Sequence, residues 1–250
     1  MKINVYIGYD KRQDKSDKFS DLINPPYQIA KHSILKNYKG DENDLVIQPI
    51  KLQDMIDNGL YWRKEDKLAS TEFTYSRFLT PHLNNYDGIA IFCDSDFLWQ
   101  CDPAETIQYL EEGQAVACVK HEYVDCHGRE KMDGQKQEWY PRKNWSSLIV
   151  FDCEHPSCKK LTKESVATES PAWLHRMTWA EDNEIGSIPL AYNYLVDYYD
   201  LPVEEIKAFH FTDGGPWHAL YQDVQYGDLW LDYLTVGEYG KLQESLKLEA

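Results

Sequence analysis

A short apolar run that ends in two aspartates is the feature that most constrains this chain. Residues 88–93 read Gly-Ile-Ala-Ile-Phe-Cys, and Asp94-Ser95-Asp96 follows directly. The run is short and rich in β-branched and aromatic residues, so it predicts a buried strand. Alternate residues of an extended chain point to the same side, so the two carboxylates can converge on one hard cation. Open α/β sheets bind ligands at the carboxyl ends of their strands, where this pair would lie. A solvated Asp-x-Asp turn is the alternative interpretation.

Strand-like and helix-like segments alternate along the chain. Apolar runs predict further strands at residues 2–7, 45–50, 115–119, 146–151 and 206–211. Spacing and capping residues predict a helix from Pro25, a helix capped by Ser70 that carries Arg77, and helices over 52–58, 103–112, 157–168, 171–180 and 241–249. This alternation is typical of an α/β fold with a mostly parallel central sheet flanked by helices. The 250 residues contain no internal repeat or low-complexity linker, so we expect one domain over residues 1–250.

The charge balance excludes several classes of partner. There are 42 acidic and 26 basic residues, for a net charge of −16. Nucleic acids and anionic membrane surfaces require a basic footprint, so we expect neither as a partner. The sequence has no run long enough for a transmembrane segment, and its start is too mixed for a signal peptide, so we expect a cytoplasmic protein, in a cell or in the host of a virus. The six cysteines are expected to be reduced thiols. Nothing in the sequence indicates an oligomeric state.

Three segments in sequence order resemble one known enzyme family. The first is the stretch from Tyr75 through Arg77 to Asp94-Ser95-Asp96, the second is Asn144–Asp152, and the third is Phe209–Trp217. Together they resemble the retaining glycosyltransferases of family 8, which are glycogenin-like or lipopolysaccharide-galactosyltransferase-like. The resemblance implies the glycosyltransferase A-type fold, in which the mostly parallel central sheet is Rossmann-like. It also implies a nucleotide-sugar-binding half at about 1–119 and an acceptor half with C-terminal helices at about 120–250.

The resemblance adds a third metal ligand to the two aspartates. His210 stands where the family has a metal-binding histidine, although a histidine between Phe209 and Phe211 could also be a metal-free core residue. Two carboxylates and one imidazole suit Mn²⁺, with Mg²⁺ as the substitute. We therefore expect a metal site at Asp94, Asp96 and His210.

The same resemblance assigns the donor-binding residues. Nucleotide-binding residues are expected at Gly8, Tyr9, Asp10 and Ser95. Diphosphate and donor-sugar contacts are expected at Arg77, Asn144, Ser146, Ser147, Gly214, Gly215 and Trp217. The family normally has a lysine just before its Pro-Trp pair, and Gly215 stands there in this chain. Arg77, Lys207 and Arg142 are the candidates to supply the missing positive charge.

The acidic segment from Glu181 to Glu184 matches an acidic motif of the family, and Asp182 is the predicted catalytic group nearest the anomeric carbon. A solvated acidic turn is the alternative. Residues 120–143 lack periodicity, and we expect them to close over the donor, with Trp139 and Tyr140 as sugar contacts.

The prediction is a metal-dependent retaining glycosyltransferase. It would move a hexose-type sugar from a nucleotide diphosphate, with UDP the expected carrier, to a glycan or another hydroxyl acceptor. Two alternatives remain open. One is a non-catalytic module that binds nucleotide sugars, and the other is a different Asp-x-Asp metal enzyme such as a nucleotidyltransferase. A nucleotidyltransferase would normally carry a basic Gly-rich loop after its first strand, which the segment from Gly8 to Arg12 matches poorly.

Overall fold

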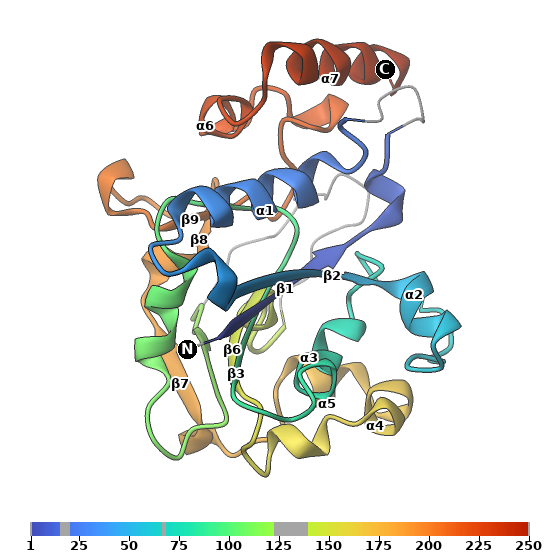
Figure 1. Cartoon of the computed structure of the whole chain (residues 1–250), viewed down its shortest axis with the longest axis vertical. Helices are drawn as coiled ribbons and strands as arrows, with labels where there is room; N and C mark the ends of the chain where they lie inside the picture. Colours follow the sequence, from blue (N-terminus) through green and yellow to red (C-terminus); the bar gives the residue numbers. More distant parts are fainter. Residues whose placement is uncertain (1, 16–20, 67–68, 123–139, 250) are drawn as a thin grey trace.

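The computed structural model describes residues 2–15, 21–66, 69–122 and 140–249 (Figure 1). Most of the segment that we expect to close over the donor, including Trp139, lies outside these described residues.

A six-stranded mixed sheet forms the centre of the molecule. Its strands are β1 (Ile3–Tyr9), β2 (Leu45–Lys51), β3 (Ile89–Cys93), β5 (Val116–Val119), β6 (Leu148–Asp152) and β7 (Ile185–Ile188). They lie in the order β2-β1-β3-β6-β5-β7. Only β6 runs antiparallel to its neighbours among these strands, so the expected mostly parallel sheet is confirmed. Ile7 of β1 pairs with Cys93 of β3, so both strands deliver their following residues to the same edge.

The two faces of this sheet pack against different helices, because side chains alternate along each strand. On one face, Val5 and Ile91 pack with Ile34 of α1 (Pro25–Asn37). On the other face, Tyr6 and Phe92 join a cluster under α3 (Thr80–Leu83), α4 (Lys163–Thr168) and α5 (Pro171–His175). Figure 1 shows α1 on one side of the sheet and α3, α4 and α5 on the other. The short helix α2 (Leu52–Asp57) follows edge strand β2.

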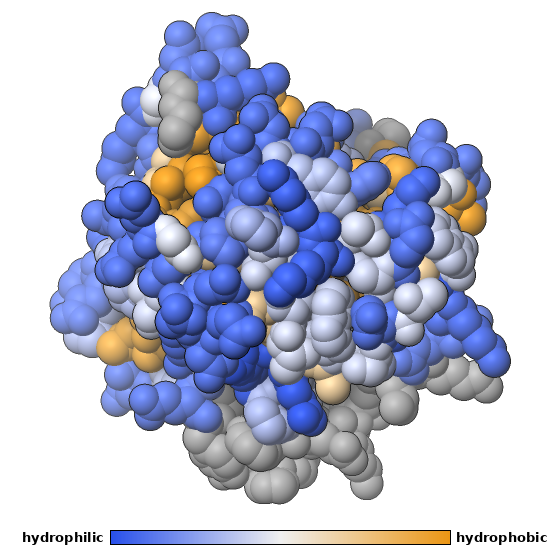
Figure 2. All heavy atoms as spheres, turned by 90° about the horizontal axis from the view of Figure 1, so that it is seen from below, coloured by the Kyte–Doolittle hydropathy of each residue, from blue (hydrophilic) through white to orange (hydrophobic). Residues whose placement is uncertain are grey.

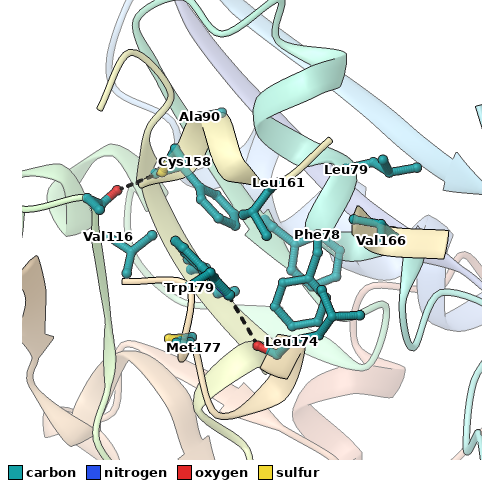
Figure 3. Packing of buried hydrophobic residues seen from close by; sticks show 14 of the residues in the cluster. Phe78, Leu79, Ala90, Val116, Cys158, Leu161, Val166, Leu174, Met177 and Trp179 are labelled. Carbon is teal, nitrogen blue, oxygen red and sulfur yellow. Dashed lines mark hydrogen bonds between the residues drawn. The ribbon is translucent and has the colours of Figure 1, made fainter. Parts of the chain in front are cut away.

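The cluster under α3, α4 and α5 joins side chains from many short elements (Figure 3). Trp179 is 1% exposed, and its Nε1 donates to the carbonyl oxygen of Leu174 at 3.3 Å. The Cys158 thiol donates to the carbonyl oxygen of Ala115 at 3.2 Å, which ties this layer to the sheet. All cysteines in the described part of the chain are free and buried, as expected.

A second, three-stranded sheet brings the third sequence motif next to the first. It consists of β4 (Phe97–Trp99), β9 (Ala208–His210) and β8 (Tyr194–Leu195), in that order. Strands β4 and β9 are antiparallel, with Phe97 opposite His210. Helices α6 (Gly227–Leu231) and α7 (Val236–Glu249) pack beyond this sheet through Trp230, Leu242 and Leu246. This pairing places His210 beside Asp96.

Two predicted helices have a different form in the structure. Arg77 lies in a 3-10 helix, Ser76–Leu79, that leads into α3 and has no side-chain cap, so the prediction of a Ser70 cap is wrong. Pro81 has no N–H to donate to the Arg77 carbonyl oxygen, which accepts from the Thr80 backbone and hydroxyl instead. The helix expected over 103–112 is a 3-10 helix, Pro103–Tyr109.

The surface matches the acidic, polar composition. Figure 2 shows one face that is mainly hydrophilic, with small and separate hydrophobic patches. Within the described ranges, every helix is too short or too polar to cross a bilayer.

The layer arrangement predicts how core and surface truncations differ. Ile91 is fully buried, so Ile91→Ala should lower the free energy of unfolding by about 2–5 kcal/mol. The control Ile56→Ala removes the same atoms from a side chain that is 45% exposed and should cost less than about 1 kcal/mol. Urea unfolding measures both, and equal losses would contradict the placement of Ile91 in the core.

Candidate functional site

Three potential metal ligands meet at the carboxyl edge of the central sheet. Asp94 follows β3, Asp96 precedes β4, and His210 ends β9. One ligand atom from each residue lies within 4.8 Å of the others. His210 Nε2 is 3.3 Å from Asp96 Oδ1, and both aspartate side chains are only about one-seventh exposed (13% and 14%). Negative charge this concentrated and this buried needs a positive partner. The group could therefore hold a metal ion.

A chain of hydrogen bonds sets the orientation of His210. Asn144 O accepts from the Ser147 hydroxyl at 2.7 Å, and Ser147 Oγ accepts from Asn193 Nδ2 at 2.9 Å. The amide oxygen of Asn193 lies 2.8 Å from His210 Nδ1. Because an amide oxygen only accepts, Nδ1 carries the hydrogen of this bond, and Nε2 is the ring nitrogen that faces Asp96. A histidine that binds a metal through one ring nitrogen is commonly oriented in this way by the N–H of the other.

Arg77 provides a fixed positive charge beside the aspartates. Its Nη1 donates to Asp94 Oδ1 at 2.7 Å and to the carbonyl oxygen of Ser146 at 2.9 Å. Its Nε donates to the carbonyl oxygens of Phe73 and Thr74, so the guanidinium is held on both sides. Arg77 is 5% exposed. The guanidinium offsets part of the repulsion between the two carboxylates.

The end of β1 lies at the same edge, but its polar groups already have partners. The Tyr9 hydroxyl donates to Asp14 at 2.7 Å, and burial together with this bond raises the pKa of Tyr9. Asp10 accepts from Nε and Nη2 of Arg12 at 2.9 and 2.6 Å. Gly8 is needed for packing, because a Cβ there would lie 2.5 Å from the Phe73 ring.

Asp94, Asp96 and His210 are called the metal group below. The segment before β6 lies against this group. Ser147 O accepts from the Asp94 backbone N–H at 2.9 Å. Ser146 Oγ lies 3.0 Å from His175 Nδ1, so both serine hydroxyls are engaged within the protein. Asn144 has the left-handed backbone conformation, with φ of 64°. Ser95 lies between the two aspartates and is 2% exposed.

The loop after His210 combines glycines with a buried tryptophan. The Trp217 ring packs against Phe211 and Trp230 and is 2% exposed, so it belongs to the core. A Cβ on Gly215 would lie 2.0 Å from this ring. Beside the loop is a cavity of about 240 Å³, lined by Val196, Asp197, Phe211, Thr212, Asp213, Gly214, Tyr221 and Val224.

Asp182 is not brought to the metal group. It directly precedes β7, whose first residue Ile185 pairs with Val116 at the start of β5. Because β5 and β7 run parallel to β3, this is the edge of the sheet opposite Asp94. The Asp182 side chain is 87% exposed and forms an ion pair with Arg142 at 2.5 Å.

His121 is a site residue that the sequence interpretation did not single out. It follows β5 at the carboxyl edge, is 4% exposed and stacks on Tyr199, whose hydroxyl lies 2.8 Å from its Nδ1. Burial lowers the pKa of His121 to about 3, and nearby His210 contributes, so the ring is neutral. Its Nε2 is buried and has no hydrogen-bond partner in the described part of the chain. The signal in the sequence was its place after the apolar run 115–119.

Asn193 is a second site residue to which the sequence interpretation assigned no role. Its role depends on contacts with Ser147, 46 residues earlier, and with His210.

Comparisons with known proteins agree with this architecture. No family model matches the chain. It is 42% identical to Protein CDI of Arabidopsis thaliana over 241 residues, which covers 95% of this chain and 87% of that protein. Similar solved structures include the bifunctional glycosyltransferase WbbM, with a TM-score of 0.64 and 14% identity over 98% of this chain and 51% of WbbM.

Two further glycosyltransferase structures share the fold. The apo form of GlyE from Streptococcus pneumoniae TIGR4 has a TM-score of 0.58 and 14% identity over 99% of this chain and 64% of GlyE. The galactosyltransferase LgtC, in complex with donor and acceptor sugar analogs, has a TM-score of 0.51 and 9% identity over 95% of this chain and 99% of LgtC. The chain thus spans about half of WbbM and just under two thirds of GlyE. The resemblance to family 8 glycosyltransferases is confirmed at the level of the fold. This chain has the glycosyltransferase A-type fold and belongs to the same family as Protein CDI.

Proposed function

We propose that this protein is a metal-dependent glycosyltransferase that uses a nucleotide-diphosphate sugar, with UDP as the expected carrier. The observation that carries the proposal is the convergence of Asp94, Asp96 and His210 at the carboxyl edge of a glycosyltransferase A-type sheet. In this proposal the sugar is a hexose type, the acceptor is a hydroxyl of a glycan or another molecule, and configuration is retained.

The donor set suits Mn²⁺, with Mg²⁺ as the substitute. A bound divalent ion supplies Lewis-acid stabilisation of negative charge on a departing diphosphate. Asp94, Asp96 and His210 would hold the ion, and Arg77 holds Asp94 in place through its 2.7 Å bond. The Gly214 backbone N–H donates to the carbonyl oxygen of Phe211 at 3.0 Å, so we assign the phosphate contact of this loop to the N–H of Gly215, which has no Cβ to shield it.

The metal site predicts the effect of removing one ligand. Asp96→Asn should abolish Mn²⁺-dependent UDP binding and leave the fold intact, because loss of one of two close carboxylates relieves repulsion. Calorimetry of UDP binding with and without Mn²⁺ measures this, with Asp54→Asn on the exposed face of α2 as the control. Mn²⁺-dependent binding that survives in Asp96→Asn would contradict the assignment.

The hydrogen-bond chain to His210 predicts a second effect. Asn193→Leu removes the acceptor for Nδ1–H, so affinity for Mn²⁺ should fall by about 10- to 100-fold. Asn193→Asp keeps an acceptor oxygen and should recover most of this loss. Titration of Mn²⁺ followed by electron paramagnetic resonance measures both variants. Equal affinities in the two variants would show that the amide does not orient the imidazole.

The catalytic proposal and the non-catalytic alternative differ in one measurement. With UDP-sugars, Mn²⁺ and no acceptor, an enzyme of this class should release UDP slowly, because water can replace the acceptor hydroxyl. A panel of UDP-, GDP- and dTDP-sugars identifies the donor by thermal shift, since a ligand at about 100 times its Kd stabilises by about 2.7 kcal/mol. Binding of a donor without hydrolysis or transfer to any acceptor would favour the non-catalytic module.

Asp182 remains a prediction for the group nearest the anomeric carbon. Its position at the opposite edge gives it no contact with the metal ligands among the described residues. If Asp182→Asn loses sugar transfer and keeps UDP affinity, the prediction holds. Unchanged transfer would reject it.

A further inference from the structure

A lysine from a distant part of the sequence contacts the loop that follows His210. Lys15 lies just beyond the segment that follows β1, and its Nζ donates to the carbonyl oxygen of Trp217 at 3.0 Å. Its side chain is 8% exposed. We propose that Lys15 binds the diphosphate of the donor in place of the lysine that glycosyltransferases of family 8 carry before Pro-Trp, an inference that rests on the proposed function.

The packing of Trp217 explains why position 215 does not carry this charge. A Cβ on Gly215 would lie 2.0 Å from the Trp217 ring, so a lysine there would displace a ring that is packed on Trp230. The loop keeps its glycine, and a positive charge has to reach it from another element. Lys15 reaches it at the residue that follows Pro216.

The other candidate cations contact other residues or lie in other parts of the fold. Arg142 forms an ion pair with Asp182 and donates to the carbonyl oxygen of Arg176. Lys207 precedes β9 and therefore lies at the end of this strand opposite His210. Arg77 contacts Asp94 and the carbonyl oxygen of Ser146, beside the aspartates. Lys15 is the cation bonded directly to the glycine-containing segment among the residues described.

Lys15 also belongs to a segment that leaves the sheet at the edge where Asp94 lies. Strand β1 runs parallel to β3, and Ile7 lies opposite Cys93, one residue before Asp94. The chain leaves β1 at this edge, and the backbone N–H of Lys15 donates to the carbonyl oxygen of Ile23. The nucleotide-binding residues expected at 8–10 and Lys15 thus belong to one short segment that begins at the carboxyl end of β1.

A carboxylate holds the ammonium group of Lys15 in this structure. Glu249 of α7 lies 2.6 Å from Lys15 Nζ, and Figure 1 shows the end of α7 beside the segment that contains Lys15. Carboxylate and phosphate oxygens are both anionic acceptors that form charge-assisted bonds with lysine. Glu249 is 39% exposed, so its side chain can turn to water when a diphosphate replaces it. Glu249 then competes with the donor for Lys15.

The test measures UDP affinity in Mn²⁺ by calorimetry for four variants of the full chain. Lys15→Gln should weaken UDP binding roughly tenfold to a hundredfold, the value of one charge-assisted bond. Lys15→Arg should retain most of the affinity. Glu249→Gln should bind UDP several-fold more tightly. The matched control is Lys160→Gln, because Lys160 donates to the carbonyl oxygen of Trp179 in the same way but lies in the layer under α4.

Uridine separates a phosphate contact from a structural role. Its affinity, measured by ligand-observed NMR, should be the same in the unaltered protein and in Lys15→Gln, because uridine has no phosphate. Equal losses for UDP and uridine, or unchanged UDP binding in Lys15→Gln, would overturn the proposal. Weaker UDP binding in Glu249→Gln would show that Glu249 does not compete with the diphosphate for Lys15. If the unaltered protein binds no UDP in Mn²⁺, the proposed function itself fails, which is a different result from a failure of Lys15 alone.

Discussion

The repulsion between two nearly buried aspartates is the constraint on which the rest of the site depends. Asp94 and Asp96 follow a strand in the middle of the central sheet, where water cannot screen them well. Arg77 offsets one carboxylate through a direct ion pair, and His210 Nε2 lies 3.3 Å from the other. Asp94, Asp96 and His210 together could also hold a divalent ion, whose charge would offset the remaining repulsion.

The small sheet places a third potential metal ligand beside the two aspartates. The pairing of β4 with β9 brings His210 to Asp96, and the backbone N–H of Phe211 donates to the Asp96 carbonyl oxygen at 3.0 Å. Asn193 lies just before β8, the neighbour of β9, and its amide links the imidazole to the segment before β6. The ligands are therefore positioned by two sheets that meet at one edge, and neither sheet holds them alone.

Helices α6 and α7 shape the loop that we assign to the donor diphosphate. They bury Trp217 and Trp230, which leaves room only for glycine at position 215. The same helix α7 supplies Glu249 to Lys15. The packing of the outer helices and the environment of Lys15 thus meet at one loop, the loop to which we assign the donor diphosphate.

The sequence by itself determined the features that depend on neighbouring residues. The apolar run before Asp94 is a strand, and the helix predicted from Pro25 begins there with Asn24 as its cap. The family resemblance correctly implied the fold and selected the residues that form the metal group. Local matching also selected Asp182, which lies before β7 and pairs with Arg142, and its role in catalysis stays a prediction.

Only the tertiary structure decided which distant residues meet. Asp96 and His210 are joined by the pairing of β4 with β9, and Lys15 meets Trp217 across 202 positions of the chain. Such contacts follow from how the chain returns to the same edge of the sheet, which the spacing of apolar residues does not specify. The orientation of His210 has the same origin, because it is set by an amide that folding alone brings within 2.8 Å of its Nδ1. Sequence periodicity determined the elements, and long-range pairing determined the chemistry that they can support.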